Sequence, residues 1–265
     1  MKTSVIALLT DFGLEDHYAA ALKAVIASIN QNVQVIDICH LVRPQDIRTG
    51  AFLLREVYSY FPKGTIFVAV VDPGVGSSRR AICIRTSRGY LVGPDNGILS
   101  LALQGERGYQ IRRIENDRYF LKPVSTTFHG RDIFAPVAAH LSRQNIFSRL
   151  GRSLRTIQKI EWPPLRWKKD SVEGTIVHID RFGNAISNIS RSDIEAKVDC
   201  KAKKVLIRVK SKQIKGICDF FMQGKREPLI AVWNSSGFLE LASPNASAAR
   251  RFGLLMNDAV TLIFQ

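Results

Sequence analysis

The N-terminal half of the chain alternates between apolar runs and amphipathic segments. Residues 5–10, 33–39 and 65–71 form nearly continuous apolar runs, and helical patterns extend between them from about Asp16 to Ile29 and from about Asp46 to Phe61. Apolar strands separated by helices are typical of a parallel sheet that is covered on both faces. The pattern therefore predicts a layered α/β domain with a mostly parallel sheet.

Shorter elements are expected to complete this domain. Strands are predicted at residues 81–86, 90–94 and 109–114. Residues 132–143 are predicted to form a helix in which Pro136 is tolerated only in the first turn. We place the α/β domain at residues 1–160.

The pattern changes after IEWPPLRWKKD (160–170), a segment whose adjacent prolines and charges suit a linker. Beyond it, short β-rich runs are separated by turn residues, with almost no helical periodicity: GTIVHID, KKVLIRVK, LIAVWNS, FLELA and AVTLIF. This pattern is typical of a small antiparallel barrel or sandwich. We therefore predict a smaller, all-β, barrel-like domain at residues 171–265.

Composition narrows the class of protein. The 265 residues, 46% hydrophobic and 23% charged, match a globular chain and argue against disorder or a coiled coil. No run approaches 18 apolar residues, and no cleavage site follows the short apolar run at the N-terminus, so neither a membrane span nor a signal peptide is predicted. Four cysteines without a CxxC pair are interpreted as core thiols of a cytoplasmic protein: Cys39, Cys83, Cys200 and Cys218.

The net charge of +15 raises the question of a polyanionic partner. Its densest part alternates with apolar residues, so the charges are expected to line one face of a strand. This basic cluster consists of Lys201, Lys203, Lys204, Arg208, Lys210, Lys212 and Lys215. A solvated strand face is the simpler interpretation. A patch for nucleic acid is the alternative, although residues 201–215 contain no aromatic side chain on which bases could stack.

Polar residues that follow apolar strands are the first candidates for a site, because ligands of open parallel sheets bind beyond the carboxyl ends of the strands. LLTDFG places Asp11 at the end of the first strand. A carboxylate there can accept both hydroxyls of a ribose. Asp16, at the start of the following helix, is either a second ligand contact or only an N-cap.

Two further junctions carry chemistry. VAVVDPGVGSSRR places Asp72 and Arg79 after the third strand, where glycines permit a close approach to a ligand. STTFHGRDIFAP places His129 before a helix that Asp132 could cap. An acid, a base and a guanidinium from different loops suit the positioning of a substrate and the deprotonation of a small nucleophile.

Other reaction classes find no support. No Gly-Lys-Ser/Thr follows the glycines of a phosphate-binding loop, and no GxSxG elbow of a serine hydrolase occurs. The five histidines form no HxxxH or HExxH pair, so no metal site is predicted. They are His17, His40, His129, His140 and His178.

Six motifs in order resemble those of the S-adenosyl-L-methionine (SAM) hydroxide adenosyltransferases, relatives of the SAM-dependent fluorinase and chlorinase. They are TDFG (10–13), DPGVGSSRR (72–80), GPDNG (93–97), TFHGRDIFAP (127–136), IDRFGN (179–184) and NSSGFLELA (234–242). The resemblance extends from about Val5 to Phe264. It implies an N-terminal α/β domain, a C-terminal β-barrel-like domain, and a homotrimer whose SAM sites lie between the N-domain of one subunit and the C-domain of the next.

The resemblance also implies a reaction. A nucleophile attacks C5′ of the ribose and expels methionine, so that water or hydroxide gives adenosine and L-methionine. SAM is then the substrate, and neither a cofactor nor a metal is implied. The hydroxide branch is marked by an Asp, Arg and His triad that the halogenases lack, and the motifs place this triad at Asp72, Arg79 and His129. SAM halogenation is an alternative function, and nucleic-acid binding by the basic C-terminal domain is another.

Substrate contacts follow from the same resemblance. It puts Asp11 on the ribose hydroxyls, Asp16 near the methionine ammonium, and Phe182 with Asn184 at the adenine. The substrate-binding residues that it implies are Asp11, Asp16, Asp72, Phe128, Asp180, Phe182, Asn184, Ser235 and Glu240.

Overall fold

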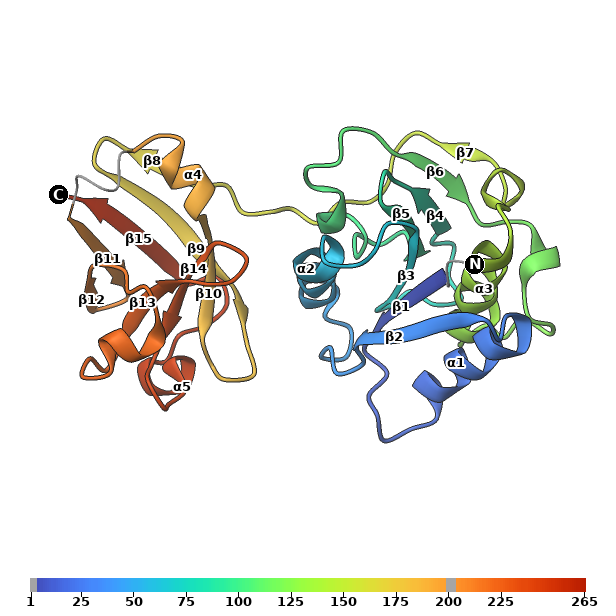
Figure 1. Ribbon diagram of the computed structural model, residues 1–265, viewed down its shortest axis with the longest axis horizontal. Helices are drawn as coiled ribbons and strands as arrows, with labels where there is room; N and C mark the ends of the chain where they lie inside the picture. Colours follow the sequence, from blue (N-terminus) through green and yellow to red (C-terminus); the bar gives the residue numbers. More distant parts are fainter. Residues whose placement is uncertain (1–3, 199–203) are drawn as a thin grey trace. The chain divides into compact units, whose positions relative to one another are not determined.

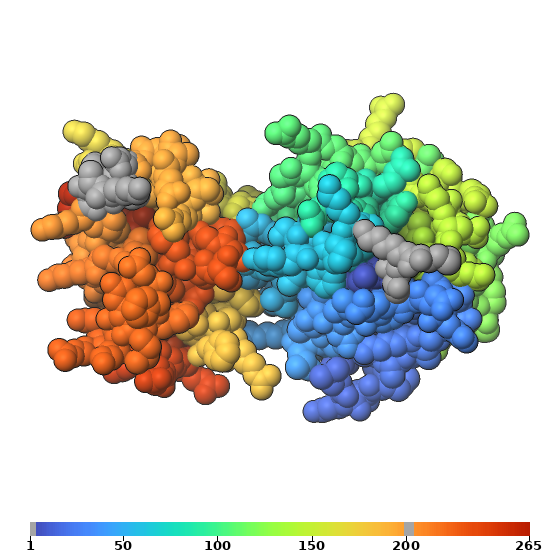
Figure 2. Space-filling view, viewed as in Figure 1, coloured from blue at the N-terminus to red at the C-terminus, as the bar shows by residue number. Residues whose placement is uncertain are grey.

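The computed structural model describes residues 4–198 and 204–265. The chain divides into two compact units, Met1–Ile160 and Glu161–Gln265 (Figure 1). The visible face of each unit is closely packed, with only single long side chains projecting from it (Figure 2). None of the helices in the described part of the chain is long and apolar enough to cross a membrane.

The strands of the first unit form one seven-stranded sheet in the order β2-β1-β3-β5-β4-β6-β7. They are β1 (Ser4–Thr10), β2 (Val33–Cys39), β3 (Thr65–Val70), β4 (Ala81–Arg85), β5 (Gly89–Pro94), β6 (Gln110–Arg113) and β7 (Ser153–Leu154). The helices are α1 (Tyr18–Ile29), α2 (Ile47–Tyr58) and α3 (Ala135–Arg143), and the short turns are η1 (Leu101–Leu103), η2 (Asp117–Tyr119), η3 (Gly130–Phe134) and η4 (Phe147–Arg149).

Pairing in this sheet is parallel from β2 through β1 and β3 to β5, and antiparallel from β5 through β4 and β6 to β7. The crossovers from β1 to β2 and from β2 to β3 are supplied by α1 and α2, whereas the connection from β3 to β5 runs through β4. Pro136 lies in the first turn of α3, as predicted.

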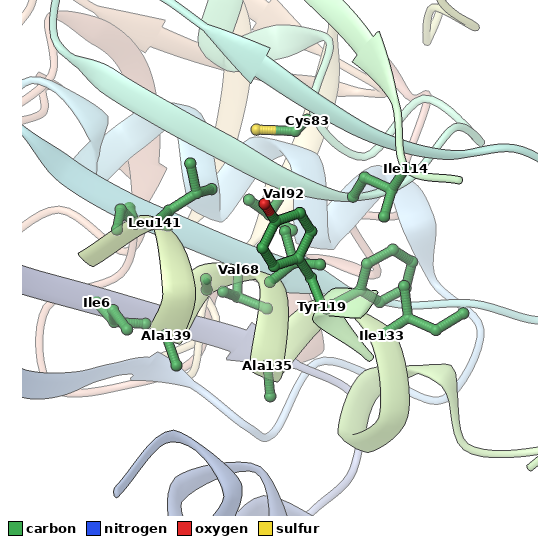
Figure 3. Packing of buried hydrophobic residues seen from close by; sticks show 14 of the residues in the cluster. Ile6, Val68, Cys83, Val92, Ile114, Tyr119, Ile133, Ala135, Ala139 and Leu141 are labelled. Atoms are coloured by element: carbon green, nitrogen blue, oxygen red, sulfur yellow. The ribbon is translucent and has the colours of Figure 1, made fainter. Parts of the chain in front are cut away.

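Both faces of the sheet are covered, which explains the continuous apolar runs. Ile6 and Val68 point into one core, which α1 and α3 complete, and part of this packing appears in Figure 3. The alternate residues, such as Ala7 and Phe67, point into a second core against α2 and η1. Because successive side chains of a strand point to opposite faces, nearly every position along β1 and β3 is buried, and most of these positions are apolar.

The second unit is built on an antiparallel sheet in the order β12-β11-β15-β9-β10-β14-β13, with β8 paired to β9. The strands are β8 (Arg166–Lys168), β9 (Ser171–Ile179), β10 (Ala185–Ser190), β11 (Val205–Val209), β12 (Lys212–Lys215), β13 (Ile230–Trp233), β14 (Phe238–Ala242) and β15 (Ala259–Phe264). Short helices are α4 (Arg191–Glu195), α5 (Ala248–Phe252) and η5 (Phe221–Gly224). A bridge between Cys218 and Val232 joins the segment after β12 to β13, so the sheet nearly closes on itself like a barrel.

Two expectations about this unit need correction. The basic cluster does not share one face, because the register pairs Arg208 with Gln213 and Val209 with Lys212, which puts Arg208 and Lys212 on opposite faces of the β11–β12 hairpin. Lys201 and Lys203 lie outside the described residues. The proline-rich segment is also not a free linker throughout, because β8 and the Pro163 carbonyl, which accepts from Asn188 Nδ2, belong to the second unit.

The interpretation of the cysteines as core thiols is right for one of them. Cys83 is fully buried in β4, whereas Cys39 and Cys218 are only half-buried, since each lies at the end of a strand or just beyond one. Cys200 lies outside the described residues.

Candidate active site

Two carboxylates of the first unit meet at the carboxyl edge of the parallel strands. Asp11 follows β1 and Asp72 follows β3, and these strands are neighbours in the sheet. Both residues line a cavity of about 220 Å³, together with Phe128 and His129. Asp11 is held there by the Gln45 backbone N–H, which donates to its Oδ2 at 2.8 Å.

The loop that carries Asp72 and Arg79 connects β3 to β4 and crosses the end of β5, which lies between these strands in the sheet. Both ends of the loop are fastened to the motif GPDNG. Asn96 Nδ2 donates to the Val71 carbonyl at 2.8 Å, and Arg80 Nε donates to the buried carboxylate of Asp95 at 2.6 Å. Asp95 also accepts the Gln158 backbone N–H at 2.8 Å. These bonds fix the two ends of the loop between which Asp72 and Arg79 lie.

The side chains of Asp72, Arg79 and His129 are in direct contact. Arg79 Nε donates to Asp72 Oδ1 at 3.0 Å, and Arg79 Nη2 lies 2.5 Å from Asp72 Oδ2 and 2.8 Å from His129 Nδ1. Only 5% of the Asp72 side chain and 11% of the Arg79 side chain are exposed. A guanidinium that bridges a carboxylate and an imidazole holds all three groups in one orientation.

The state of His129 follows from these contacts. Arg79 can only donate, so Nδ1 of the imidazole accepts and, in the neutral ring, Nε2 carries the proton. Burial and the nearby charge of Arg79 hold the pKa of His129 below its ordinary value, although the carboxylates of Asp72 and Asp132 act in the opposite direction. His129 is therefore neutral at physiological pH.

His129 lies directly before η3, a single π-helical turn. Such turns are rare and occur often at functional sites. A Cβ at Gly130 would come within 3.1 Å of the Phe12 ring, so the glycine lets the TDFG turn pack against the segment that carries His129. Phe12 also meets Phe128 edge to face, with the ring centroids 5.6 Å apart.

Two capping hypotheses are wrong. Asp132 lies inside the π-turn and is fully buried, where it accepts the Ser125 N–H at 2.8 Å and pairs with Arg131, so it fastens the loop before His129 instead of capping a helix. His17, not Asp16, is the N-cap residue of α1. Asp16 is exposed and does not line the cavity that Asp11 and Asp72 share.

A second group of the expected residues gathers in the second unit. Asp180, Phe182, Asn184, Ser235 and Glu240 line one cavity of about 820 Å³. Its base is the tight turn between β9 and β10, in which Asp180 Oδ1 accepts the Asn184 N–H at 2.8 Å. Gly183 has a φ of +84°, and a Cβ there would collide with Ser247. This turn leaves the Phe182 side chain 78% exposed at the cavity.

Glu240 is an unusual member of this group because it is only 5% exposed. Burial, and the charge of Asp180 nearby, raise the pKa of Glu240 to about 7, although hydrogen bonds from Asn234 and Asn184 act against the shift. A carboxyl group of this kind gains or loses its proton near neutral pH.

Replacing Glu240 by glutamine should therefore change how stability depends on pH. The folded state holds the Glu240 proton more tightly than the unfolded state, so the wild-type free energy of unfolding falls as the pH rises from about 4.5 to about 7. In Glu240→Gln this pH-dependent decrease in the free energy of unfolding should be smaller by up to about 3 kcal/mol. Urea unfolding of variant and wild type at about pH 5 and about pH 8 measures the difference, and the stability gain should appear at the higher pH.

Glu195→Gln is the control, since Glu195 is an exposed helix residue paired with Arg191. Its effect should be small and the same at both pH values. A Glu240→Gln difference that does not vary with pH would show that Glu240 is not proton-linked to folding.

Some lining residues were not predicted. Phe220, Phe221 and Asp219 line the cavity of the second unit, and Gln45 lines that of the first. The adjacent aromatic pair Phe220 and Phe221 is a sequence signal that could have indicated two of these residues, and the structure leaves the pair 60% and 47% exposed. Among the described residues, no group of three or more His, Cys, Asp or Glu is placed to hold a metal ion.

A carboxylate, a guanidinium and a neutral imidazole in contact at the carboxyl edge of a parallel sheet are an arrangement typical of enzymes of the α/β class. The model of the SAM hydroxide adenosyltransferase N-terminal domain matches residues 6–151, and that of the C-terminal domain matches residues 174–261. The chain belongs to the SAM hydroxide adenosyltransferase family.

Individual relatives agree over nearly the whole chain. The (R)-S-adenosyl-L-methionine hydrolase of Methanocaldococcus jannaschii is 34% identical, covering 98% of this chain and 96% of its own. That of Thermus thermophilus is 36% identical, covering 96% and 98%. A fluorinase of Nocardia brasiliensis is 27% identical, covering 96% and 94%. The crystal structure of an uncharacterized conserved protein from Thermotoga maritima superposes with a TM-score of 0.90 at 36% identity, covering 97% of this chain and 99% of that one.

Proposed function

We propose that this protein is a SAM hydrolase that uses water to cleave SAM at C5′ of the ribose and releases adenosine and L-methionine. The observation that carries the proposal is the contact of Asp72 and His129 through Arg79 beside a cavity. Membership of the family, with relatives named (R)-S-adenosyl-L-methionine hydrolase, supplies the substrate.

The reaction is a displacement at carbon. A water oxygen forms a bond to C5′ while the bond from C5′ to the sulfonium sulfur breaks, and its electron pair remains on the sulfur of methionine. One proton of the water passes to a base. Because a sulfonium is a good leaving group, the enzyme's main tasks are to hold the water in line with the breaking bond and to remove its proton.

The contacts support separate roles for the three side chains. Asp72 is the proton acceptor, since its carboxylate oxygens keep lone pairs beyond those that Arg79 uses. His129, whose Nδ1 is occupied by Arg79, directs Nε2–H at the water oxygen and orients it. Arg79 holds both groups and offsets the negative charge that develops on the oxygen.

Substrate contacts come from both units. Asp11 binds the ribose hydroxyls, next to Phe128. Phe182 and Asn184 hold the adenine, and Asp180, Ser235 and Glu240, which line the same cavity, complete the site. Asp16 would contact the methionine ammonium from an exposed position. As the family resemblance implies, we infer a homotrimer in which residues of the first unit act with those of the second unit of a neighbouring subunit.

Halogenation of SAM is less well supported than hydrolysis. A halide needs a dry pocket that favours an anion, whereas the cavity of the first unit contains the Asp72 carboxylate, which would repel chloride or fluoride. Nucleic-acid binding by the second unit is also less well supported, because residues 201–215 contain no aromatic side chain and Lys212 lies on the opposite face of the hairpin from Arg208 and Lys215.

Incubation of the purified protein with SAM in chloride-free buffer tests the proposal. We expect adenosine and methionine in equal amounts, and no 5′-halo-adenosine when chloride or fluoride is added. In water labelled with oxygen-18, the label should appear in the 5′-hydroxyl of adenosine and not in methionine. A halogenated nucleoside as main product, or the absence of any product from folded protein, would contradict the proposed function.

A further inference from the structure

A buried histidine contacts the residue that precedes Asp11 and is not one of the three residues Asp72, Arg79 and His129. His40 follows β2 and is only 3% exposed. Its ring contacts two side chains, with Nδ1 2.8 Å from Thr10 Oγ1 and Nε2 3.1 Å from Asp37 Oδ1. Only the Nδ1 contact with Thr10 has hydrogen-bond geometry, whereas Nε2 faces the Asp37 carboxylate at ion-pair distance.

The partners assign the tautomer of this ring. Asp37 is an acceptor whose other oxygen takes a hydrogen bond from Lys23 at 2.5 Å. Partial burial acts to raise the pKa of Asp37, but hydrogen bonds from Lys23 and His40 hold it below its ordinary value, so the carboxylate is charged at neutral pH. In the tautomer whose Nε2–H faces this carboxylate, Nδ1 accepts from the Thr10 hydroxyl.

The Thr10 hydroxyl also fixes the backbone of the motif TDFG. With its only proton directed at His40, its oxygen accepts the Phe12 backbone N–H at 3.2 Å. The His40 carbonyl accepts the Gly13 N–H at 2.7 Å, at a position where φ is +73°. The ring and the backbone of His40 thus hold both sides of the turn that contains Asp11.

The arrangement Asp37, His40, Thr10 has the order of a nucleophilic triad, but burial excludes that role. Thr10 is fully buried, so its hydroxyl cannot meet a substrate. What it can do is keep the turn in one conformation, so that Asp11 is already in place when a ligand arrives.

We propose that His40 is a positioning residue, which acts through the Thr10 hydroxyl to hold Asp11 ready for the ribose of the substrate. This inference rests on the proposed function, in which Asp11 binds SAM. The Gln45 N–H reports on the position of Asp11 directly, because this amide donates to Asp11 Oδ2. The hydrogen bond protects the amide from hydrogen exchange while the carboxylate stays in place.

Thr10→Val tests the inference, since valine has the same shape and lacks the hydroxyl. We expect the dissociation constant of SAM, measured by calorimetry, to rise about tenfold, and Thr10→Ser to restore it to within about twofold. Thr65→Val is the matched control. Thr65 is equally buried, at the start of β3, and its hydroxyl donates only to the nearby Pro62 carbonyl at 2.8 Å.

A double-mutant cycle separates positioning from general destabilisation. If Thr10 acts through Asp11, Thr10→Val should weaken SAM binding by less than about twofold once Asp11→Asn is present. An undiminished tenfold effect in the Asp11→Asn background, or no effect of Thr10→Val alone, would overturn the inference.

Hydrogen exchange in the ligand-free protein gives a readout that does not depend on SAM. Exchange of the Gln45 and Gly13 amides should be at least about tenfold faster in Thr10→Val than in Thr65→Val. Unchanged exchange would refute the positioning role even if SAM binds. Faster exchange in a protein whose wild type does not bind SAM would refute the proposed function and leave the hold of the Thr10 hydroxyl on the turn established.

Discussion

Replacing Asp72 by asparagine should lower kcat for SAM hydrolysis by about 10³-fold while the dissociation constant of SAM changes by less than about threefold. Asparagine keeps the shape of the side chain and can still accept from Arg79 Nε, which lies 3.0 Å from Asp72 Oδ1. It cannot take a proton from water. The loss should therefore appear in the chemical step, which single-turnover measurements isolate from binding.

The control for this experiment is Asp117→Asn, which neutralises an exposed carboxylate paired with Lys122. It should leave both constants unchanged. If Asp72→Asn weakened SAM binding as much as it slowed turnover, Asp72 would be a group that holds the substrate and not the base.

The second large effect is expected from Gly76→Ala, in the loop between Asp72 and Arg79. Gly76 has a φ of +78°, and a Cβ there would lie 2.3 Å from the Thr126 carbonyl oxygen, which is backbone and cannot turn away. The loop must then move away from the segment that carries His129, and the bond of 2.8 Å from Arg79 to His129 is lost. We expect a fall of about 10²-fold in kcat and of about 2–4 kcal/mol in the free energy of unfolding.

Gly64→Ala separates the effect of backbone strain at a positive φ from that of the collision with Thr126. Gly64 has a similar φ of +93°, but a Cβ there would meet nothing within 4 Å. This control carries only the backbone strain, about 1 kcal/mol, and should keep full activity. Equal activity of the two variants would show that the close approach of Gly76 to Thr126 does not position the triad.

The parallel core of the first unit could be predicted from sequence because burial on both faces leaves a plain signal. The predicted runs at 5–10, 33–39 and 65–71 correspond to β1, β2 and β3 almost residue for residue. β10 was not predicted, because three of its six residues are polar. Ser187 and Asn188 are buried there, and each finds a specific partner, the Leu239 carbonyl and the Thr175 N–H. Hydropathy cannot reveal a polar residue that the tertiary structure satisfies.

In the candidate site too, some residues could be predicted from the sequence and others depend on the tertiary structure. Motifs identified Asp72, Arg79 and His129, and the structure brings these three into contact. The role of Asp132 was misjudged, because its partner Ser125 precedes it and the helix begins with a π-turn that no local pattern indicates. His40 carried no motif at all, since the role proposed for it depends on Thr10, which only the pairing of β1 with β2 brings close.

The path of the loop from β3 to β4 has a consequence for the order in which the molecule assembles. β5, the strand that this loop crosses, comes later in the chain and pairs with β4 through a short hairpin, a local contact that forms fast. The two ends of the loop come together only when β5 of this hairpin pairs with β3. Asp72 and Arg79 are seven positions apart, yet we expect the ends of their loop to be fixed only after β5 has paired with β3, which makes the assembly of the triad a late step of folding.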